Sequence, residues 1–129
     1  MMILEKTIMR LLIVDDSEIV RERLKAMLSE VPNVETVDLA KDQHEARELV
    51  GKLNPDVVIL DIQMPGGSGI DLLREIKKRK QPPLAIVLTN QSYPQYQRVC
   101  INAGADFFFD KSTEFDKVAE VLKKANNHA

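Results

Sequence analysis

Short apolar runs alternate with longer amphipathic segments along most of this chain. Three of the runs are uninterrupted, at Leu11–Val14, Val57–Leu60 and Leu84–Leu88. Uninterrupted runs of this length are typical of strands that are buried on both faces of a parallel sheet. The more mixed segment Asn33–Ala40 indicates an edge strand, and Phe107–Phe109 indicates a short fifth strand.

The segments between these strands carry apolar residues at the spacing of one helical face. They predict helices over residues 17–31, 41–53, 69–80, 96–103 and 114–127. Ser17, Ser68 and Thr113 stand where N-cap residues are expected, because their hydroxyls can accept a hydrogen bond from the first helical turn. On the fourth helix we expect Val99 and Cys100 to face the core.

Alternating strands and helices of these lengths predict an α/β fold. A doubly wound, five-stranded parallel sheet would be covered by helices on both faces, with Phe107 and Phe109 in its core. In such folds the functional crevice lies at the carboxyl ends of the strands. The 129 residues suffice for one domain, and we expect an N-terminal extension over residues 1–9 followed by the domain over residues 10–129.

Composition and charge exclude several classes of function. Apolar residues make up 44% of the chain, and a formal net charge of -2 leaves no basic excess for direct binding of nucleic-acid phosphates. The longest apolar runs are far too short to cross a bilayer, and no signal-peptide pattern opens the chain. The single Cys100 excludes an internal disulfide. We therefore expect a cytoplasmic protein without a membrane segment.

Reactive side chains stand directly after four of the expected strands. Asp15 and Asp16 follow the first strand, Asp61 follows the third, and Thr89 and Lys111 follow the fourth and fifth. Because parallel strands have their carboxyl ends at one edge of the sheet, these side chains are expected to meet there.

Three carboxylates that lie close together repel one another, so such a cluster takes up a proton or binds a cation. Oxygen ligands without His or Cys favour Mg²⁺. A carboxylate beside Mg²⁺ can attack phosphorus, and the transfer then depends mainly on positioning and charge neutralisation. Lys111 would supply a cation and Thr89 a hydroxyl for the phosphoryl oxygens, while Gly66 and Gly67 allow a close backbone approach.

These residues fall into short motifs spread along the chain. The motifs are Asp15-Asp16, then Asp61-Ile62-Gln63-Met64-Pro65-Gly66, then Thr89, and finally Gly104-Ala105-Asp106 leading to Lys111. Together, from about Arg10 to the C-terminus, they resemble the receiver domain of two-component response regulators, which is CheY-like. The resemblance implies a flavodoxin-like three-layer fold with strand order 2-1-3-4-5.

The resemblance also implies residue roles. Asp61 matches the phosphoacceptor, and Thr89 and Lys111 match the hydroxyl and amine that hold the phosphoryl group. Thr89 and Phe108 match the pair of residues that switch conformation. The domain would modify only itself, through phosphorylation and dephosphorylation of Asp61, and would not be an enzyme acting on a separate substrate.

Cofactor and partners follow from the same resemblance. Mg²⁺ would be held by Asp15, Asp16, Asp61 and the main-chain carbonyl of Gln63. The phosphoryl donor would be a sensor histidine kinase or a histidine phosphotransfer protein. The face formed by the fourth helix, fifth strand and fifth helix would control a downstream partner or output domain, and a homodimer through this face is a further expectation.

Two departures from the family and two alternatives stay open. The switch aromatic of the family is often tyrosine, whereas Phe108 has no hydroxyl to donate a hydrogen bond. Ser112 follows Lys111 where the family commonly has proline, so this peptide bond is expected to be trans. The first alternative is a phosphorylation-independent docking module on the same fold. The second is a Mg²⁺-dependent phosphatase or phosphotransferase, several of which carry a second Asp two residues after the nucleophile, where this chain has Gln63.

Overall fold

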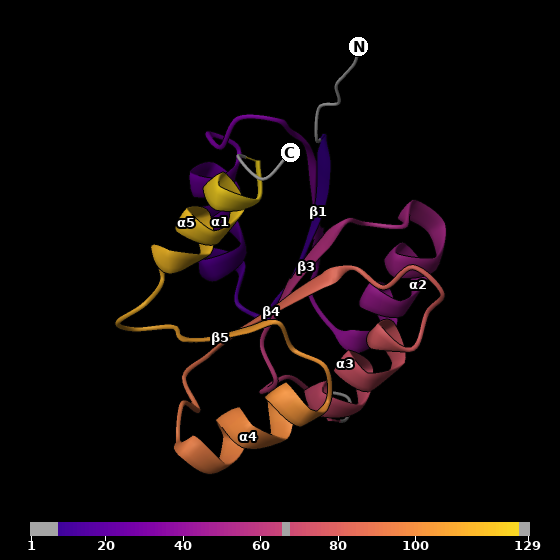
Figure 1. The fold of residues 1–129 in the computed structure, drawn as a ribbon, viewed down its shortest axis with the longest axis vertical. Coiled ribbons are helices and arrows are strands. Elements are labelled where there is room, and N and C mark those ends of the chain that lie inside the picture. Colours follow the sequence, from indigo (N-terminus) through magenta and orange to yellow (C-terminus); the bar gives the residue numbers. More distant parts are fainter. Residues whose placement is uncertain (1–7, 66–67, 127–129) are drawn as a thin grey trace.

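The computed structural model describes residues 8–65 and 68–126, and it has the expected α/β architecture (Figure 1). Five parallel strands form one sheet in the order β2-β1-β3-β4-β5. The strands are β1 Met9–Val14, β2 Val34–Ala40, β3 Val57–Leu60, β4 Leu84–Thr89 and β5 Phe107–Asp110. The helices are α1 Glu18–Leu28, α2 Gln43–Leu53, α3 Gly69–Lys77, α4 Pro94–Asn102 and α5 Lys117–Asn126. The predicted fold class, strand order and edge position of the second strand are confirmed.

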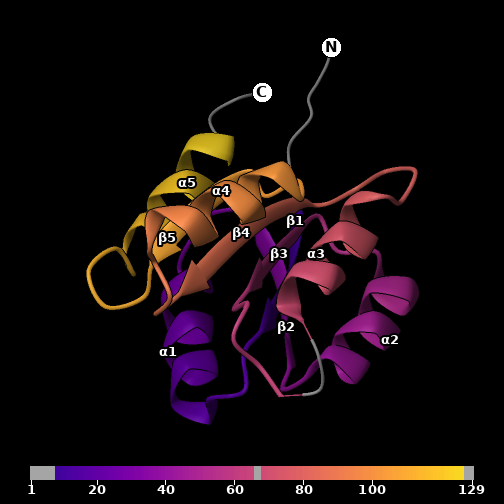
Figure 2. The same cartoon turned by 90° about the horizontal axis from the view of Figure 1, so that it is seen from below.

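The sheet separates two hydrophobic cores. Alternate side chains of β1 point to opposite faces, so that Leu12 and Val14 belong to one core and Leu11 and Ile13 to the other. The first core is covered by α2, α3 and α4, and the second by α1 and α5 (Figures 1 and 2). In the described part of the chain, none of the helices combines the length and apolar character required to span a bilayer.

Side-chain caps set helix ends that differ from the predicted ones. Ser17 and Ser68 cap α1 and α3 as expected, with their hydroxyls accepting main-chain N–H groups of the first turn. The second helix begins at Gln43 because Asp42 is its cap and accepts from Glu45 N at 2.8 Å. The expected cap Thr113 is wrong, since the fifth helix begins only at Lys117.

Two residues expected in the core are partly exposed. Val99 on α4 is 38% exposed and Phe107 is 36% exposed. The reason for Phe107 is its place on β5, which forms an edge of the sheet and pairs only with β4. Phe108 points to the core under α4, whereas Phe109 packs on the opposite face with its ring centroid 5.9 Å from that of Phe107.

β1 begins at Met9, the last residue of the expected extension, and Met9 is 3% exposed. Residues 1–7 lie outside the described part of the chain. The division into an extension and a domain therefore stays a prediction.

Cys100 is expected to resist thiol reagents while the protein is folded. Its side chain is fully buried, and burial raises the pKa of the thiol to about 11. At pH 8 only about one thiol in a thousand would be ionised, and the ionised thiol is the nucleophile. Labelling of Cys100 by a thiol reagent, measured by mass spectrometry, should therefore be slow in buffer and fast in denaturant. Rapid labelling without unfolding would contradict the burial.

Candidate functional site

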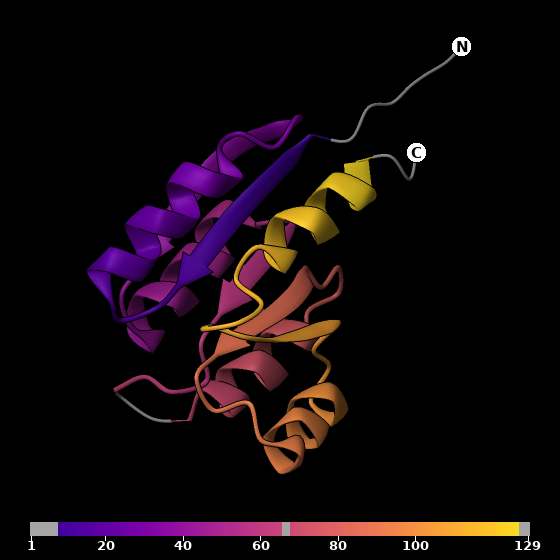
Figure 3. The same cartoon turned by 90° about the vertical axis from the view of Figure 1, so that its left-hand side faces the viewer.

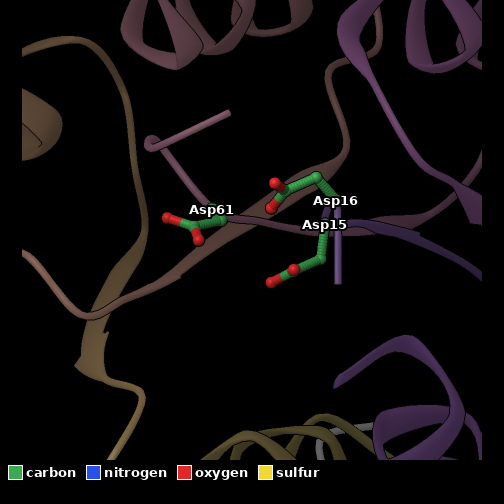
Figure 4. Close-up of side chains that lie close together, drawn as sticks. All are labelled: Asp15, Asp16 and Asp61. Carbon is green, nitrogen blue, oxygen red and sulfur yellow. The ribbon is translucent and has the colours of Figure 1, made fainter. Parts of the chain in front are cut away.

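Three aspartates meet at the carboxyl ends of β1 and β3 (Figure 4). Asp15 and Asp16 follow β1 and Asp61 follows β3; the strands are paired up to their last residues, and Asp61 N donates to Val14 O at 3.1 Å. Each aspartate offers a carboxylate oxygen, and these oxygens lie within 4.8 Å of one another. Asp15 and Asp61 are buried, whereas Asp16 is exposed. The sequence therefore correctly predicted the convergence of these three residues.

Lys111 comes from the end of β5 to the same place. Its ammonium Nζ lies 2.8 Å from Asp15 Oδ2 and 2.8 Å from Asp61 Oδ2. Burial alone would lower the pKa of Lys111, but its hydrogen bonds to Asp15 and Asp61 outweigh that effect and the pKa is raised. One ammonium faces three carboxylates, so the cluster keeps an excess of negative charge and attracts a further cation.

Main-chain N–H groups hold the two buried carboxylates in place. Asp15 Oδ1 accepts from Ser17 N at 2.8 Å, and Asp61 Oδ1 accepts from Gln63 N at 2.9 Å. The second oxygen of each carboxylate accepts from Lys111. The orientation of both carboxylates is thus fixed by the loops that follow β1 and β3.

The donor set of the site suits a hard divalent cation. Among the described residues, the cluster consists of carboxylates from Asp15, Asp16 and Asp61, without a histidine or cysteine. Oxygen-only ligands are the choice of Mg²⁺ and Ca²⁺, and Mg²⁺ typically uses few carboxylates and keeps several waters. The exposed side of Asp16 leaves room for such waters.

Thr89 and Phe108 lie on the neighbouring strands β4 and β5, as expected. Thr89 is fully buried, and its main-chain carbonyl accepts from Lys111 N at 2.9 Å. Its hydroxyl Oγ1 accepts from Gln91 N at 3.2 Å, which holds the start of the loop that leads to α4. Phe108 is partly buried against the core under α4.

The turn after Lys111 is built around Asp110, which the sequence analysis missed. The carboxylate of Asp110 accepts hydrogen bonds from Ser112 N, Ser112 Oγ, Thr113 N and Ser92 Oγ. Bonds from Ser112 and Ser92 lower the pKa of Asp110. The Lys111–Ser112 peptide is trans, as expected. Asp followed two residues later by Ser is a turn signal that could have revealed this network.

A close backbone contact at Gly69 was also missed. A Cβ atom at Gly69 would lie 2.5 Å from Ile62 Cα and 2.8 Å from Ile62 O, so the start of α3 lies directly against the segment that follows Asp61. Gly66 and Gly67, to which the sequence analysis assigned the close approach, lie outside the described residues.

Gly69→Ala is expected to lower the free energy of unfolding by about 1–3 kcal/mol, because the added methyl group must displace backbone. The matched control is Gly51→Ala on the exposed face of α2, where a Cβ meets nothing within 4 Å. That change should raise stability by up to about 1 kcal/mol, since alanine favours a helix interior. Urea unfolding checks both, and equal effects would contradict the contact.

A family model for the response regulator receiver domain matches residues 11–123. The chain belongs to the response regulator receiver domain family. The matched residues include the three aspartates of the site, and they also include Thr89 and Lys111.

The curated relatives that this chain resembles include an enzyme and a transcriptional regulator. It is 45% identical over 62% of its length to a protein-glutamate methylesterase/protein-glutamine glutaminase of Caulobacter vibrioides, covering 23% of that protein. It is 32% identical over 91% of its length to the transcriptional regulatory protein LiaR of Bacillus subtilis, covering 56% of that protein. The chain therefore spans about a quarter of the methylesterase and about half of LiaR.

A solved receiver structure is also similar to this chain over most of its length. The response regulator domain of Thermotoga maritima CheB is 32% identical and superposes with a TM-score of 0.80, covering 95% of this chain and 96% of the other.

Proposed function

We propose that this receiver domain is a phosphoacceptor in a two-component phosphorelay, and that Asp61 takes the phosphoryl group. The observation that carries the proposal is the position of the Lys111 ammonium, which lies 2.8 Å from carboxylate oxygens of both Asp15 and Asp61. A cation at this distance can neutralise negative charge that arrives at Asp61. A docking module that never takes up phosphate has no need of this arrangement.

The proposed donor is a phosphohistidine on a sensor histidine kinase or a histidine phosphotransfer protein. An oxygen of Asp61 attacks phosphorus, an O–P bond forms, the N–P bond breaks and the imidazole leaves. Water later attacks the same phosphorus, which releases inorganic phosphate and restores the carboxylate. Asp61 would thus be modified and regenerated, and the domain would act on no separate substrate.

The proposed cofactor is Mg²⁺, for which Asp15, Asp16, Asp61 and the main-chain carbonyl of Gln63 are the ligands. When bound, it would neutralise charge on the phosphoryl oxygens. The oxygen-only donor set and the excess negative charge of the cluster support this assignment. Gln63 N already bonds Asp61 Oδ1, so the segment that carries the carbonyl is tied to the phosphoacceptor.

Thr89 and Lys111 are proposed to hold the phosphoryl group, and Thr89 and Phe108 to transmit its presence. A hydrogen bond to a charged group contributes about 1.5–3 kcal/mol, so two offer at most about 3–6 kcal/mol. Lys111 already bonds Asp61 before phosphorylation, so the net gain is smaller. A full shift from 1:99 to 99:1 needs about 5.5 kcal/mol, and phosphorylation would therefore shift the population only in part.

The proposed output is control of a downstream partner or output domain by the face formed from α4, β5 and α5, with a homodimer through the same face as a further proposal. The proposed location is the cytoplasm. Direct contact with nucleic acid is not proposed, because the chain has a formal net charge of -2.

The proposal is tested by incubating the protein with Mg²⁺ and a small-molecule phosphodonor, followed by intact-mass measurement and peptide mapping. The expected result is one added phosphoryl group on Asp61 that is lost over time and fails to form after Mg²⁺ is chelated. No mass increase would favour the phosphorylation-independent docking module. Sustained turnover of external phosphate esters would favour a phosphatase.

Gln63→Ala is expected to shorten the lifetime of the phosphorylated form several-fold. The Gln63 side chain is exposed and stands two residues after Asp61, where it would restrict the approach of water. Its main-chain N–H, which bonds Asp61, is unaffected by the change. Loss of the phosphoryl mass over time measures the effect. The control is Gln81→Ala, which changes an exposed residue shortly before the start of β4, far along the sheet from the carboxyl ends of the strands. An unchanged lifetime would remove this role of Gln63.

A further inference from the structure

Gln43 carries an unusual unpaired group. It is the first residue of α2 and is only 3% exposed, and its side-chain amide nitrogen Nε2 is buried with no hydrogen-bond partner. Among residues 8–65 and 68–126, it is the one buried side-chain nitrogen or oxygen in this condition. A buried donor without an acceptor is costly and calls for a physical explanation.

The start of α2 lies beside the acidic site. β2 ends at Ala40, whose carbonyl accepts from Asp15 N at 3.1 Å, and Gln43 follows three residues later. Gln43 and Ala46 share one face of α2 because they are three residues apart. Ala46 belongs to the same core as Met64, which comes from the segment after Asp61. The ribbon shows the start of α2 near the segment that follows β3, on the same side of the sheet (Figures 2 and 3).

Capping of α2 does not explain the residue. Asp42 is the N-cap and accepts from Glu45 N at 2.8 Å, while Glu45 Oε1 accepts from Lys41 N at 2.9 Å. Both hydrogen bonds at the start of the helix are made without the side chain of Gln43. An apolar residue would fill the same space without an unpaired donor, so we expect the amide to find an acceptor in another arrangement of the segments around it.

The segment that follows β3 is the part of the site that is proposed to respond to a bound ion. Gln63 N is bonded to Asp61 Oδ1, and the carbonyl of Gln63 is the proposed main-chain ligand. Turning that carbonyl toward an ion at Asp61 also turns the N–H of Met64, because both belong to one rigid peptide unit. We expect the backbone of residues 62–65 to adjust with it near the start of α2.

We propose that Gln43 is a positioning residue for the acidic site, whose side-chain amide donates a hydrogen bond to a main-chain carbonyl of the segment 62–65 when the site is loaded. This inference rests on the proposed function, because it requires a divalent ion at Asp15, Asp16 and Asp61. The donor that has no partner in this structure becomes a bonded donor in the loaded state. Gln43 thereby favours the loaded arrangement of the segment after Asp61.

The direct test follows the Gln43 side-chain amide in the nuclear magnetic resonance spectrum of the wild-type protein. Its signals are assigned by their absence in Gln43→Met, which has similar length and no donor. Mg²⁺ is added first, and then beryllofluoride as a phosphoryl mimic. The expected result is a downfield shift of one amide proton and slower exchange with solvent. Unchanged Gln43 signals at saturating Mg²⁺ and beryllofluoride would overturn the inference.

A second measurement compares stability and affinity. Gln43→Met should raise the midpoint of thermal unfolding without divalent ions and weaken Mg²⁺ binding about three- to tenfold, the range expected for one lost hydrogen bond. The matched control is Gln97→Met on the exposed surface of α4, which should change neither. Equal Mg²⁺ affinity of Gln43→Met and wild type would overturn the positioning role.

The two proposals fail in different ways. If the wild-type protein binds no Mg²⁺, the proposed function fails and takes this inference with it. If the wild-type protein binds Mg²⁺ and is phosphorylated on Asp61 but the Gln43 amide does not respond, only this inference fails. The spectrum of the wild-type protein decides the matter even if Gln43→Met does not fold.

Discussion

Asp61→Asn is expected to abolish phosphorylation by a small-molecule phosphodonor while the fold persists. The neutral amide lacks the carboxylate oxygen that attacks phosphorus, so no acyl phosphate can form. The shape of the side chain is kept, and an amide oxygen can still accept from Gln63 N in place of Asp61 Oδ1. Intact-mass measurement after incubation with Mg²⁺ and phosphodonor should show no added phosphoryl group, where the wild type gains one.

The matched control is Asp71→Asn, which changes an exposed aspartate of α3 that pairs with Arg74 on the surface. This variant should be phosphorylated as fast as the wild type. Thermal unfolding of Asp61→Asn verifies that the loss is chemical and not a loss of fold. A full phosphoryl mass on folded Asp61→Asn would show that another residue is the acceptor.

Lys111→Met is expected to lower the free energy of unfolding by about 3–5 kcal/mol in the absence of divalent ions. The change removes one partner of a buried ion pair and leaves the buried carboxylates of Asp15 and Asp61 without their cation. Added Mg²⁺ should restore part of the lost stability, because a bound cation takes over the neutralisation. Urea unfolding with and without Mg²⁺ measures both effects.

Lys117→Met is the control for this substitution. Lys117 pairs with Glu114 on the surface, with its own side chain 53% exposed, so its loss should cost less than about 1 kcal/mol. Equal effects of the two substitutions, or no response of Lys111→Met to Mg²⁺, would contradict the proposed electrostatic role.

The pKa of Lys111 also predicts how stability depends on pH. Because the folded state raises this pKa above the ordinary value of 10.5, the lysine stabilises the fold fully below that value. The contribution is lost as pH rises through the higher pKa of the folded state. Lys111→Met should lack this part of the alkaline loss of stability.

The strands could be predicted from sequence because their signal is local. A run such as Val57–Leu60 is apolar at every position and is buried on both faces in the structure. The convergence at the site followed from the same pattern, since parallel strands bring their carboxyl ends to one edge. The predicted helix boundaries were less accurate, because side-chain hydrogen bonds to the main chain help to set where a helix begins. Asp42 bonds the first turn of α2, and Asp110 bonds the turn that precedes α5.

Other features depend on contacts between distant segments, which no local pattern encodes. The exposure of Phe107 follows from the place of β5 at the sheet edge, although its sequence is as apolar as that of a buried strand. The need for glycine at Gly69 arises only when α3 lies against Ile62. The unpaired amide of Gln43 likewise becomes visible only when the core around α2 is assembled.

The described ends of the chain and the acidic site lie at opposite ends of the sheet. β1 starts and α5 finishes at the edge where the N and C labels stand, whereas Asp61 follows the carboxyl end of β3 (Figures 1 and 3). A fluorescent protein or an enzyme joined next to Ile8 or Asn126 would therefore attach at the end of the sheet away from Asp61.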